Sequence, residues 1–558
     1  MVNVKNLFGM AVMATALVAC SSNDDLASNG KDNVGKTGEA YASFKINLPT
    51  TSGTRAAGDP QGTPDFEHGT AAEYEVKNGT ILIFDATTEK FVTSAELGTM
   101  NPWTDVKKDG VTTSAIATVK LENVTVGGNY KALVLLNNNS KATPKVTLPT
   151  TADTYTSWSK DVNKVDVDQY VSTDGIFMAN APMYSTTTEP TTLVKINNVY
   201  ASPEEAQAKT ATVVYVERGL AKVTMKDFTA GGYPIGDGTY AGAKVEIKNW
   251  QLDVTNKSTF PVHQTAGLNS WSEIWNTPRF YDGTNATFKR VYWGVDPNYD
   301  KATYQTLENC KTAFNMIKKE NVVGLAGVAN PQYCLENTFD LNNMKQGQTT
   351  RVVFKAVFTP KGITTGETFY KIGNNTAIWT EERLKQQIRT VALTAMRITN
   401  ADEQDKYGVD LTKGTNISGK AGQHLVEAAN ITYSGDAASS KVTGEVVNTI
   451  NEKLGLTETG ISTYLNGEAY YIARIKHFNE LTPWNAGEAY DSNNEKYLGR
   501  YGVLRNNWYD LSVTSISGLG YPDVPEVKPT LPDDENDQYI NVEVKILSWA
   551  KRSQSIVL

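Results

Sequence analysis

Few residues in this sequence are spaced for catalysis or metal binding. The four histidines, His68, His263, His424 and His477, are scattered and form no HExxH motif or other pairing of the kind that holds zinc. No GxSxG, P-loop or Rossmann glycine pattern is present. Carboxylates are abundant, so a glycosidase pair stays open on sequence alone. We therefore predict no catalytic residues, no metal site and no cofactor.

A cysteine at position 20 could carry a lipid. It follows a short apolar run from Leu7 to Ala19, whose end reads Leu17-Val18-Ala19-Cys20. The run is shorter than the roughly 20 residues of a bilayer span, and it fits a secretory signal. The run and its cysteine resemble the lipobox of bacterial lipoproteins, in which the thiol takes a diacylglyceryl group. We predict a signal peptide over residues 1–19 and a lipid on Cys20.

The acidic segment directly after this cysteine indicates where the protein is localised. Ser21-Ser22-Asn23-Asp24-Asp25 resembles the export signal of surface lipoproteins in Bacteroidetes. This resemblance implies export through the periplasm to the outer membrane surface.

Two further cysteines, Cys310 and Cys334, would lie in a compartment that permits disulfides. A bridge between them would contribute about 3 kcal/mol of stability. Two separate buried thiols fit the sequence equally well.

The composition is that of an ordinary soluble protein of two to four domains. The 558 residues are 40% hydrophobic and 20% charged, with a net charge of -8 and no basic block. We therefore expect no nucleic-acid partner. The ten tryptophans and 27 tyrosines could line a sugar-binding face, but aromatic residues in β-sandwiches more often form the core.

Most of the chain has the pattern of a β-protein. Short segments rich in β-branched residues alternate with turn sequences, which is typical of sandwich domains. Apolar residues at helical spacing predict helices over Glu381–Arg397 and Lys441–Leu456, and a third over Tyr304–Lys319. We predict a first sandwich over residues 56–215 and a second, with helical inserts, over 216–520. The expected strands include 79–84, 115–126, 130–136, 194–199, 211–223, 243–254, 351–358, 469–475 and 509–516.

The first strand pattern precedes an exposed loop that contains an arginine. Residues 40–48 alternate, and Phe44, Ile46 and Leu48 belong to the apolar face. Arg55 lies in the middle of a loop rich in Thr, Gly and Pro. Cleavage between Arg55 and Ala56 would release residues 20–55, with their lipid, as a propeptide.

The last strand pattern follows a segment rich in proline and acidic residues. Residues 521–537 are expected to be an extended spacer with a reach of about 50 Å. The final segment, 538–558, alternates and ends on an apolar tripeptide. Its candidate donor residues are Ile540, Val542, Val544, Ile546, Trp549, Ile556, Val557 and Leu558.

These two features suggest polymerisation by strand exchange. Loss of the first strand would open a groove, and the last strand of another copy would fill it by β-strand addition. Because groove and donor are different surfaces, the contact would propagate head to tail. The pattern fits equally well with a permanent first strand and a tail that packs on its own domain.

The whole chain resembles the Bacteroidetes fimbrillins of type V pili, and among them the shaft subunits of minor fimbriae. The resemblance depends on Arg505-Asn506-Asn507-Trp508-Tyr509, on the spacer and last strand, on Ser52–Asp59 around the arginine, and on Val216-Glu217-Arg218. Residues 260–460 match only loosely.

The resemblance implies two transthyretin-like β-sandwiches, an arginine-specific maturation protease and donor-strand exchange into extracellular fimbriae that support adhesion and biofilm formation. It implies as partners other copies of the chain, accessory pilus subunits, the outer membrane through the lipid before cleavage, and host or bacterial surface ligands. The presence of both an arginine site and a C-terminal strand favours the shaft role. The alternative is a lipid-anchored glycan-binding protein of a nutrient-uptake system.

Overall fold

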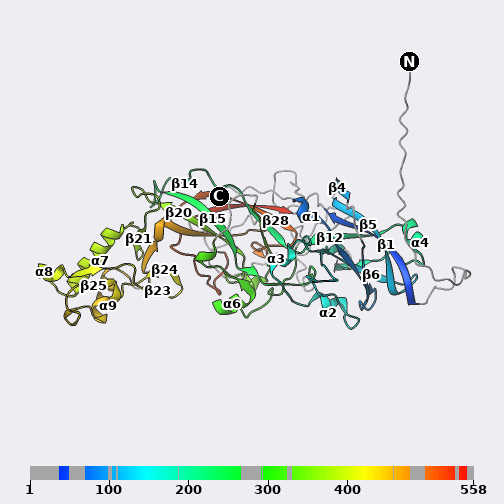
Figure 1. The fold of residues 1–558 in the computed structure, drawn as a ribbon, viewed down its shortest axis with the longest axis horizontal. Coiled ribbons are helices and arrows are strands. Elements are labelled where there is room, and N and C mark those ends of the chain that lie inside the picture. Colours follow the sequence, from blue (N-terminus) through cyan, green and yellow to red (C-terminus); the bar gives the residue numbers. More distant parts are fainter. Residues whose placement is uncertain are drawn as a thin grey trace, which may run out of the picture.

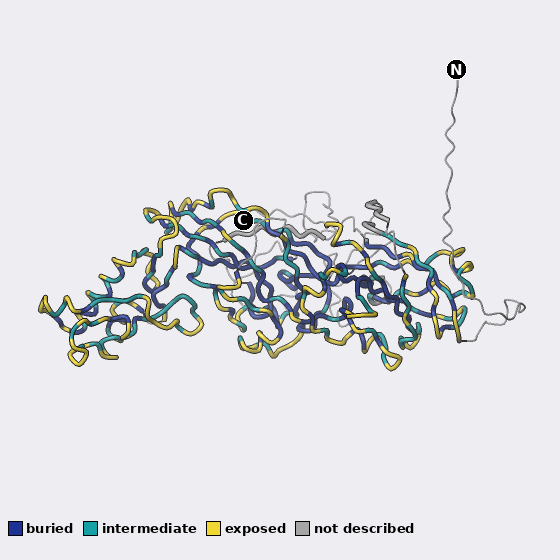
Figure 2. The backbone as a smooth tube through the Cα atoms, in the orientation of Figure 1, coloured by how far each residue is buried: buried dark blue, intermediate teal, exposed yellow. Residues whose placement is uncertain are grey.

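The structure is a computed structural model. It describes residues 37–49, 69–98, 104–108, 111–185, 188–265, 291, 293–322, 330–456, 458–477, 497–534 and 540–548. The molecule is elongated, with two β-sandwiches end to end and a smaller module at the far end of the second (Figure 1). Buried backbone runs through both sandwiches (Figure 2). The predicted mostly-β sandwich fold is confirmed.

The first sandwich is one nine-stranded sheet folded around an apolar core. Strand β12 joins its two halves, because Phe44 to Asn47 of β1 pair with residues 212–215 of β12 and strand β8 pairs with residues 216–218. Alternating side chains of both halves, including Phe44, Ile83 and Val134, meet in the core between them. The strand order is β3 (Phe91–Glu96), β2 (Gly79–Asp85), β6 (Tyr130–Leu136), β8 (Met178–Asn180), β12 (Thr212–Arg218), β1 (Thr37–Pro49), β5 (Val111–Thr125) and β4 (Thr104–Lys108), with β11 (Val194–Lys195) beside β6.

Short helices and strands cover this sandwich. They break the long connections between its strands, and each of the helices α2, α3 and α4 begins at a Thr, Asp or Ser whose side chain caps it. They are α1 (Ala71–Tyr74), α2 (Tyr155–Ser159), β7 (Asn163–Lys164), α3 (Val167–Tyr170), β9 (Met183–Ser185), β10 (Thr188–Thr191) and α4 (Pro203–Ala208).

The second sandwich consists of two four-stranded sheets packed face to face. Side chains such as Trp250, Phe354 and Tyr509 fill the core between them. One sheet has the order β19 (Gln332–Cys334), β13 (Ala221–Met225), β28 (Asn507–Ile516) and β29 (Ile540–Ser548). The other has the order β14 (Tyr233–Pro234), β15 (Lys244–Asp253), β20 (Arg351–Thr359) and β27 (Glu468–Arg474). Smaller elements on its side are β16 (Thr255–Asn256), β17 (Ser258–Thr259), α6 (Leu307–Ala313), β18 (Phe314–Asn315), and the 3-10 turns Lys319–Asn321 and Leu341–Asn343.

A separate module is inserted between the neighbouring strands β20 and β27. It has its own apolar core, centred on Leu384, Ile388 and Ile450. It consists of β21 (Phe369–Ile372), α7 (Glu381–Ala395), α8 (Ala401–Gln404), β22 (Tyr407–Val409), β23 (Asn416–Ile417), β24 (Lys420–His424), β25 (Ile431–Tyr433), α9 (Gly444–Lys453) and β26 (Ile461–Tyr464), with 3-10 turns at Ala428–Asn430, Ala437–Ser439 and Leu465–Gly467. The chain enters and leaves through paired strands, because β21 lies antiparallel to β26. We call residues 369–467 the insert.

Two predicted helices are confirmed, and the third is shorter than predicted. The first two are α7 and α9 of the insert. The third, predicted over residues 304–319, is helical only over residues 307–313. Phe314 takes an extended conformation and its ring packs against Tyr304 at 5.3 Å between centroids, which ends the helix. The predicted strand 194–199 is likewise reduced to β11.

Candidate functional site

Strand β1 occupies the interior of the first sandwich. Its inward side chains, including Phe44, Ile46 and Leu48, are at most 1% exposed. Its outward face also has partners: the Ser43 hydroxyl donates to the Ala206 carbonyl at 2.9 Å, and Asn47 accepts from the Ser114 hydroxyl at 2.6 Å. Lys45 between them is exposed. The predicted removable strand is therefore a fully integrated core element.

Both edges of β1 are hydrogen-bonded. It runs antiparallel to β5 from Thr37 to Pro49, and parallel to β12 from Phe44 to Asn47. Parallel pairing of strands so distant in sequence is a long-range contact that only the complete domain can make. Removal of β1 would uncover two strand edges and a trough lined by the core side chains of β5 and β12. Each of the three large inward residues contributes roughly 1.5–3 kcal/mol of burial.

Strand β29, the predicted donor, is an edge strand of the second sandwich. Among the described residues its backbone pairs only with β28, in antiparallel register, from Ile540 opposite Ile516 to Ser548 opposite Asn507. This pairing places Val542, Val544 and Ile546 opposite Val513, Leu511 and Tyr509. The donor segment of this structure thus lies on its own domain, held along one side.

The spacer before this strand, predicted to be extended with a reach of about 50 Å, is docked on the protein. Residues 521–534 pack on the second sandwich, with Val524, Val527, Asp533 and Asp534 all buried. Its apolar and acidic side chains contact residues from distant segments of the sequence. The expected reach of about 50 Å is therefore not available to these residues while they stay docked.

Several predicted site residues lie outside the described residues. These are Cys20, Arg55, Ala56, Trp549, Ile556, Val557 and Leu558.

The remaining cysteines, Cys310 and Cys334, are both buried and are not joined to each other. They belong to different apolar clusters, and burial raises the pKa of Cys310 to about 11 and of Cys334 to about 12. Of the two alternatives, the structure has the separate thiols.

Two segments that carried the family resemblance meet at the junction of the sandwiches. The Asn506 side-chain oxygen accepts from the backbone N–H of Arg218 at 3.2 Å, and the Asn506 N–H donates to the Leu220 carbonyl at 2.7 Å. The Lys222 ammonium lies 3.6 Å from the centre of a Trp508 ring. Both motifs thus have a structural role in joining the domains.

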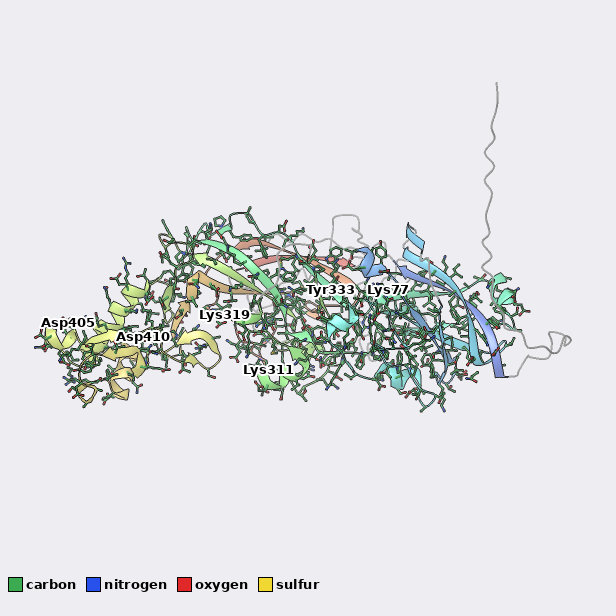
Figure 3. All side chains as sticks on the ribbon, viewed as in Figure 1. Lys77, Lys311, Lys319, Tyr333, Asp405 and Asp410 are labelled. Atoms are coloured by element: carbon green, nitrogen blue, oxygen red, sulfur yellow. The ribbon has the colours of Figure 1, made fainter. Side chains whose placement is uncertain are left out.

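A buried ion pair at this junction was not predicted. Lys222 of the second sandwich contacts Glu73 of the first at 2.8 Å, and the Tyr333 hydroxyl donates to Glu73 at 2.6 Å. Tyr333 lies near the middle of the molecule (Figure 3). Burial alone would raise the pKa of Glu73, but the Lys222 charge and these hydrogen bonds outweigh it and lower that pKa. No sequence signal marks the pair, because its members lie in different domains.

Other chemistry is sparse in the described part of the chain. His263 forms a buried pair with Glu217 at 2.6 Å, and Arg505 forms another with Glu336 at 3.1 Å. Across the described ranges no three His, Cys, Asp or Glu residues gather in a way that could hold a metal ion. Among the same residues no helix has the length and apolarity needed to cross a bilayer. A cavity of about 470 Å³ lies between α6, the insert and the spacer.

The geometry of the last strands can be compared with known protein families. Residues 462–555 match the family model described as major fimbrial subunit protein type IV, fimbrillin, C-terminal. The match covers β27, β28, the spacer and β29. The resemblance to Bacteroidetes fimbrillins is thereby confirmed, and it indicates a structural subunit of cell-surface fimbriae.

Solved structures give more distant likenesses. A candidate cell adhesion protein from Parabacteroides distasonis is 11% identical with a TM-score of 0.38, covering 92% of this chain and 99% of its own. The C-terminally truncated tip fimbrial protein Mfa3 from Porphyromonas gingivalis is 11% identical with a TM-score of 0.31, covering 91% and 100%. A fimbrial assembly protein from P. distasonis is 12% identical with a TM-score of 0.27, covering 57% and 82%. No curated protein matches the chain. Likenesses this distant do not transfer a function.

Proposed function

We propose that this chain is a non-enzymatic shaft subunit of a surface fimbria that assembles by protease-triggered donor-strand exchange. It is exported through the periplasm, lipidated at Cys20 and held at the outer membrane surface. An arginine-specific protease then cleaves between Arg55 and Ala56. The released propeptide takes β1 with it, and β29 of the next subunit enters the trough.

The position of β1 is the observation that carries this proposal. A strand that is at most 1% exposed on its inner face and paired on both edges is also the one strand upstream of the arginine loop in the described sequence. Its loss would leave a trough that demands a replacement strand. The same cut would detach the subunit from its lipid.

The last strand repeats the pattern of the first. Both alternate apolar and polar residues, and Phe44-Lys45-Ile46 corresponds to Val544-Lys545-Ile546. A strand with this pattern can place Val542, Val544 and Ile546 inward and its charged residues outward. The two strands are therefore interchangeable in alternation, although they differ in side-chain volume.

The partners follow from this scheme. They are further copies of the chain and accessory subunits, while adhesion to host or bacterial surface ligands and support of biofilm formation belong to the assembled fimbria. Nothing in the described residues favours the glycan-uptake alternative.

Replacement of Arg55 tests the proposal directly. We expect Arg55→Ala to give a full-length, lipidated, monomeric protein on the cell surface, whereas wild-type filaments contain chains that begin at Ala56. The measurements are electron microscopy of the surface and N-terminal sequencing of filament protein. Arg397→Ala, in a different loop, is the matched control and should assemble normally. Filaments whose subunits retain residues 37–49 would contradict the scheme.

A further inference from the structure

The spacer is fixed to the second sandwich along its first half by backbone contacts. Tyr521 and Tyr470 exchange two N–H to carbonyl bonds of 2.8 Å, so the spacer covers the edge of β27. Four residues later, the Arg351 guanidinium donates to the Pro525 carbonyl at 2.7 Å. Arg351 is itself held by Asp253 at 2.8 Å, with both side chains at most 2% exposed. This attachment uses rigid strand residues of the sandwich.

Two valines of the spacer enter separate apolar clusters. Val524 packs with Val353, Tyr470 and Ile472. Val527 packs with Val254, Cys310 and Phe314. If the spacer moved freely, both apolar clusters would be exposed to water, and each uncovered side chain would lose its free energy of burial.

The end of the spacer is held by its two buried aspartates. Asp533 accepts from the Thr349 hydroxyl at 2.9 Å, and its carbonyl accepts from the Arg474 guanidinium at 2.6 Å. Asp534 accepts from the Tyr501 hydroxyl at 2.7 Å and pairs with Arg500 at 3.0 Å. Asp533 and Asp534 are 0% and 4% exposed, so withdrawal of this end would leave arginine charges without these partners inside the protein.

Strand β29 is attached differently from this spacer. It is an edge strand, and among the described residues its backbone pairs on one side only, with β28. We infer that the spacer is a permanent clamp, and that it stays docked on its own subunit while the chain beyond Asp534 is donated. This inference rests on the proposed strand exchange.

The clamp has two consequences for the structure of the fibre. The donor begins after Asp534, instead of at residue 521. The donor also leaves each subunit from a fixed point beside Arg500 and Tyr501. The interaction partner of the spacer is therefore its own sandwich, in the monomer and in the fibre alike.

A native thiol allows the clamp to be locked. A Cβ placed on Gly347 would lie 2.8 Å from the Cys310 sulfur and 2.9 Å from the Pro529 Cα, so that thiol and the spacer approach the same glycine. Pro529→Cys therefore introduces a second thiol near Cys310, and titration of free thiols before assembly shows the fraction of chains in which the two are cross-linked. Pro529→Cys with Cys310→Ala is the matched control that cannot cross-link.

A second lock holds the donor strand. Ser512 and Glu543 are opposite each other in the β28–β29 ladder, so Ser512→Cys with Glu543→Cys joins the two strands. Purified full-length chains of both locked variants are treated with an arginine-specific protease, with and without reductant. Assembly is followed by size-exclusion chromatography and electron microscopy.

The two cross-linked variants distinguish failure of the clamp inference from failure of the proposed strand exchange. We expect the spacer-locked chain to form filaments within about twofold of the wild-type amount, and the strand-locked chain to form none until it is reduced. Loss of filaments in the spacer lock, restored by reductant, would overturn the clamp and leave strand exchange standing. Filaments from the strand lock would overturn strand exchange itself.

Amide hydrogen exchange on the wild-type chain gives an independent readout that needs no cross-link. The Tyr521 and Asp533 amides, which bond to Tyr470 and Met344, should be equally protected in monomer and filament. A tenfold or greater loss of protection at both amides on assembly would contradict the clamp.

Discussion

Glu73 shows how one side chain ties the two sandwiches together. Its carboxylate meets Lys222 and Tyr333 of the second domain, and its backbone carbonyl accepts from the Arg218 guanidinium at 2.8 Å. The Glu73 and Lys222 side chains are each 4% exposed. Loss of one member leaves the other charge buried, which typically costs roughly 3–5 kcal/mol.

This carboxylate predicts a pH dependence of stability. Because the folded-state pKa of Glu73 is lowered, its contribution is complete above the unfolded pKa near 4.5 and is lost as pH falls through the folded value. We expect Glu73→Gln to be less stable than wild type by roughly 3–5 kcal/mol at pH 7. The difference in free energy of unfolding should narrow as pH falls below the unfolded pKa near 4.5 and through the lower folded pKa. Urea unfolding of both proteins at several pH values measures this difference in the free energy of unfolding. Glu308→Gln, in an exposed pair, should show no such difference.

We expect a substitution at Phe44 to lower the stability of the precursor but not that of the fibre. Phe44→Ala leaves a cavity in the first sandwich, and should lower the free energy of unfolding of the uncleaved chain by roughly 3–5 kcal/mol. Filaments should show no loss, since the residue departs with the propeptide. Thermal unfolding of both forms is the measurement, with Lys45→Ala on the same strand as control. An equal loss in filaments would mean that β1 is retained.

At the scale of elements, short segments rich in β-branched residues between turn sequences were the reliable signal. They located β2, β6, β15, β20, β27 and β28 within a few residues, and the period-two pattern located β1, whose inner face is buried. The strand β12 continues in the first sheet to Arg218, and β13 begins the second sheet at Ala221, just beyond the predicted boundary at residue 216.

Contacts between residues that are far apart in the sequence could not be predicted. Pairing of β1 with β12 joins residues more than 160 positions apart, and alternation gives no information about which strand is the neighbour. The docked spacer was missed for a related reason. Its proline and acidic composition is typical of a solvated segment, and the arginines that bury Asp533 and Asp534 lie elsewhere in the chain.

The insert is an element that the fold should tolerate losing. Its two ends are joined by a hydrogen bond of 3.1 Å from the Gly373 N–H to the Gly460 carbonyl, directly after the β21–β26 pair. We expect replacement of residues 374–459 by an Asn-Gly turn to leave both sandwiches folded and assembly intact. Circular dichroism and filament counts measure this. A chain that no longer folds would show that the insert supports the sandwich core.

At the scale of the whole molecule, the sandwiches share one apolar cluster. Leu82, Phe84 and Leu133 of the first sandwich pack with Leu335 and Trp508 of the second. The β7–β17 pair also crosses the junction. The subunit is therefore expected to transmit force as one body.

Cooperative unfolding follows from this junction. The Arg218 side chain is fully buried, and it bonds to Glu73 and to Asn506. We expect wild type to unfold in a single calorimetric transition over both sandwiches, and Arg218→Ala to split it into two. Lys131→Ala, remote from the junction, is the control. An unsplit transition in Arg218→Ala would assign the coupling to the remaining junction contacts, namely the apolar cluster, the Glu73–Lys222 pair and the β7–β17 pair.

The place of β1 in the sheet also has a consequence for biosynthesis. Thr212 to Tyr215, the parallel partners of β1, leave the ribosome long after β1 does, so the first sandwich cannot close until most of its chain exists. Until then an apolar strand and an open trough are both exposed, and each is a target for aggregation. A gene that began at Ala56 would not supply β1, the strand that fills the trough while the first sandwich folds. We expect its product to collect in inclusion bodies, and a synthetic peptide of residues 37–49, added during refolding, to rescue it.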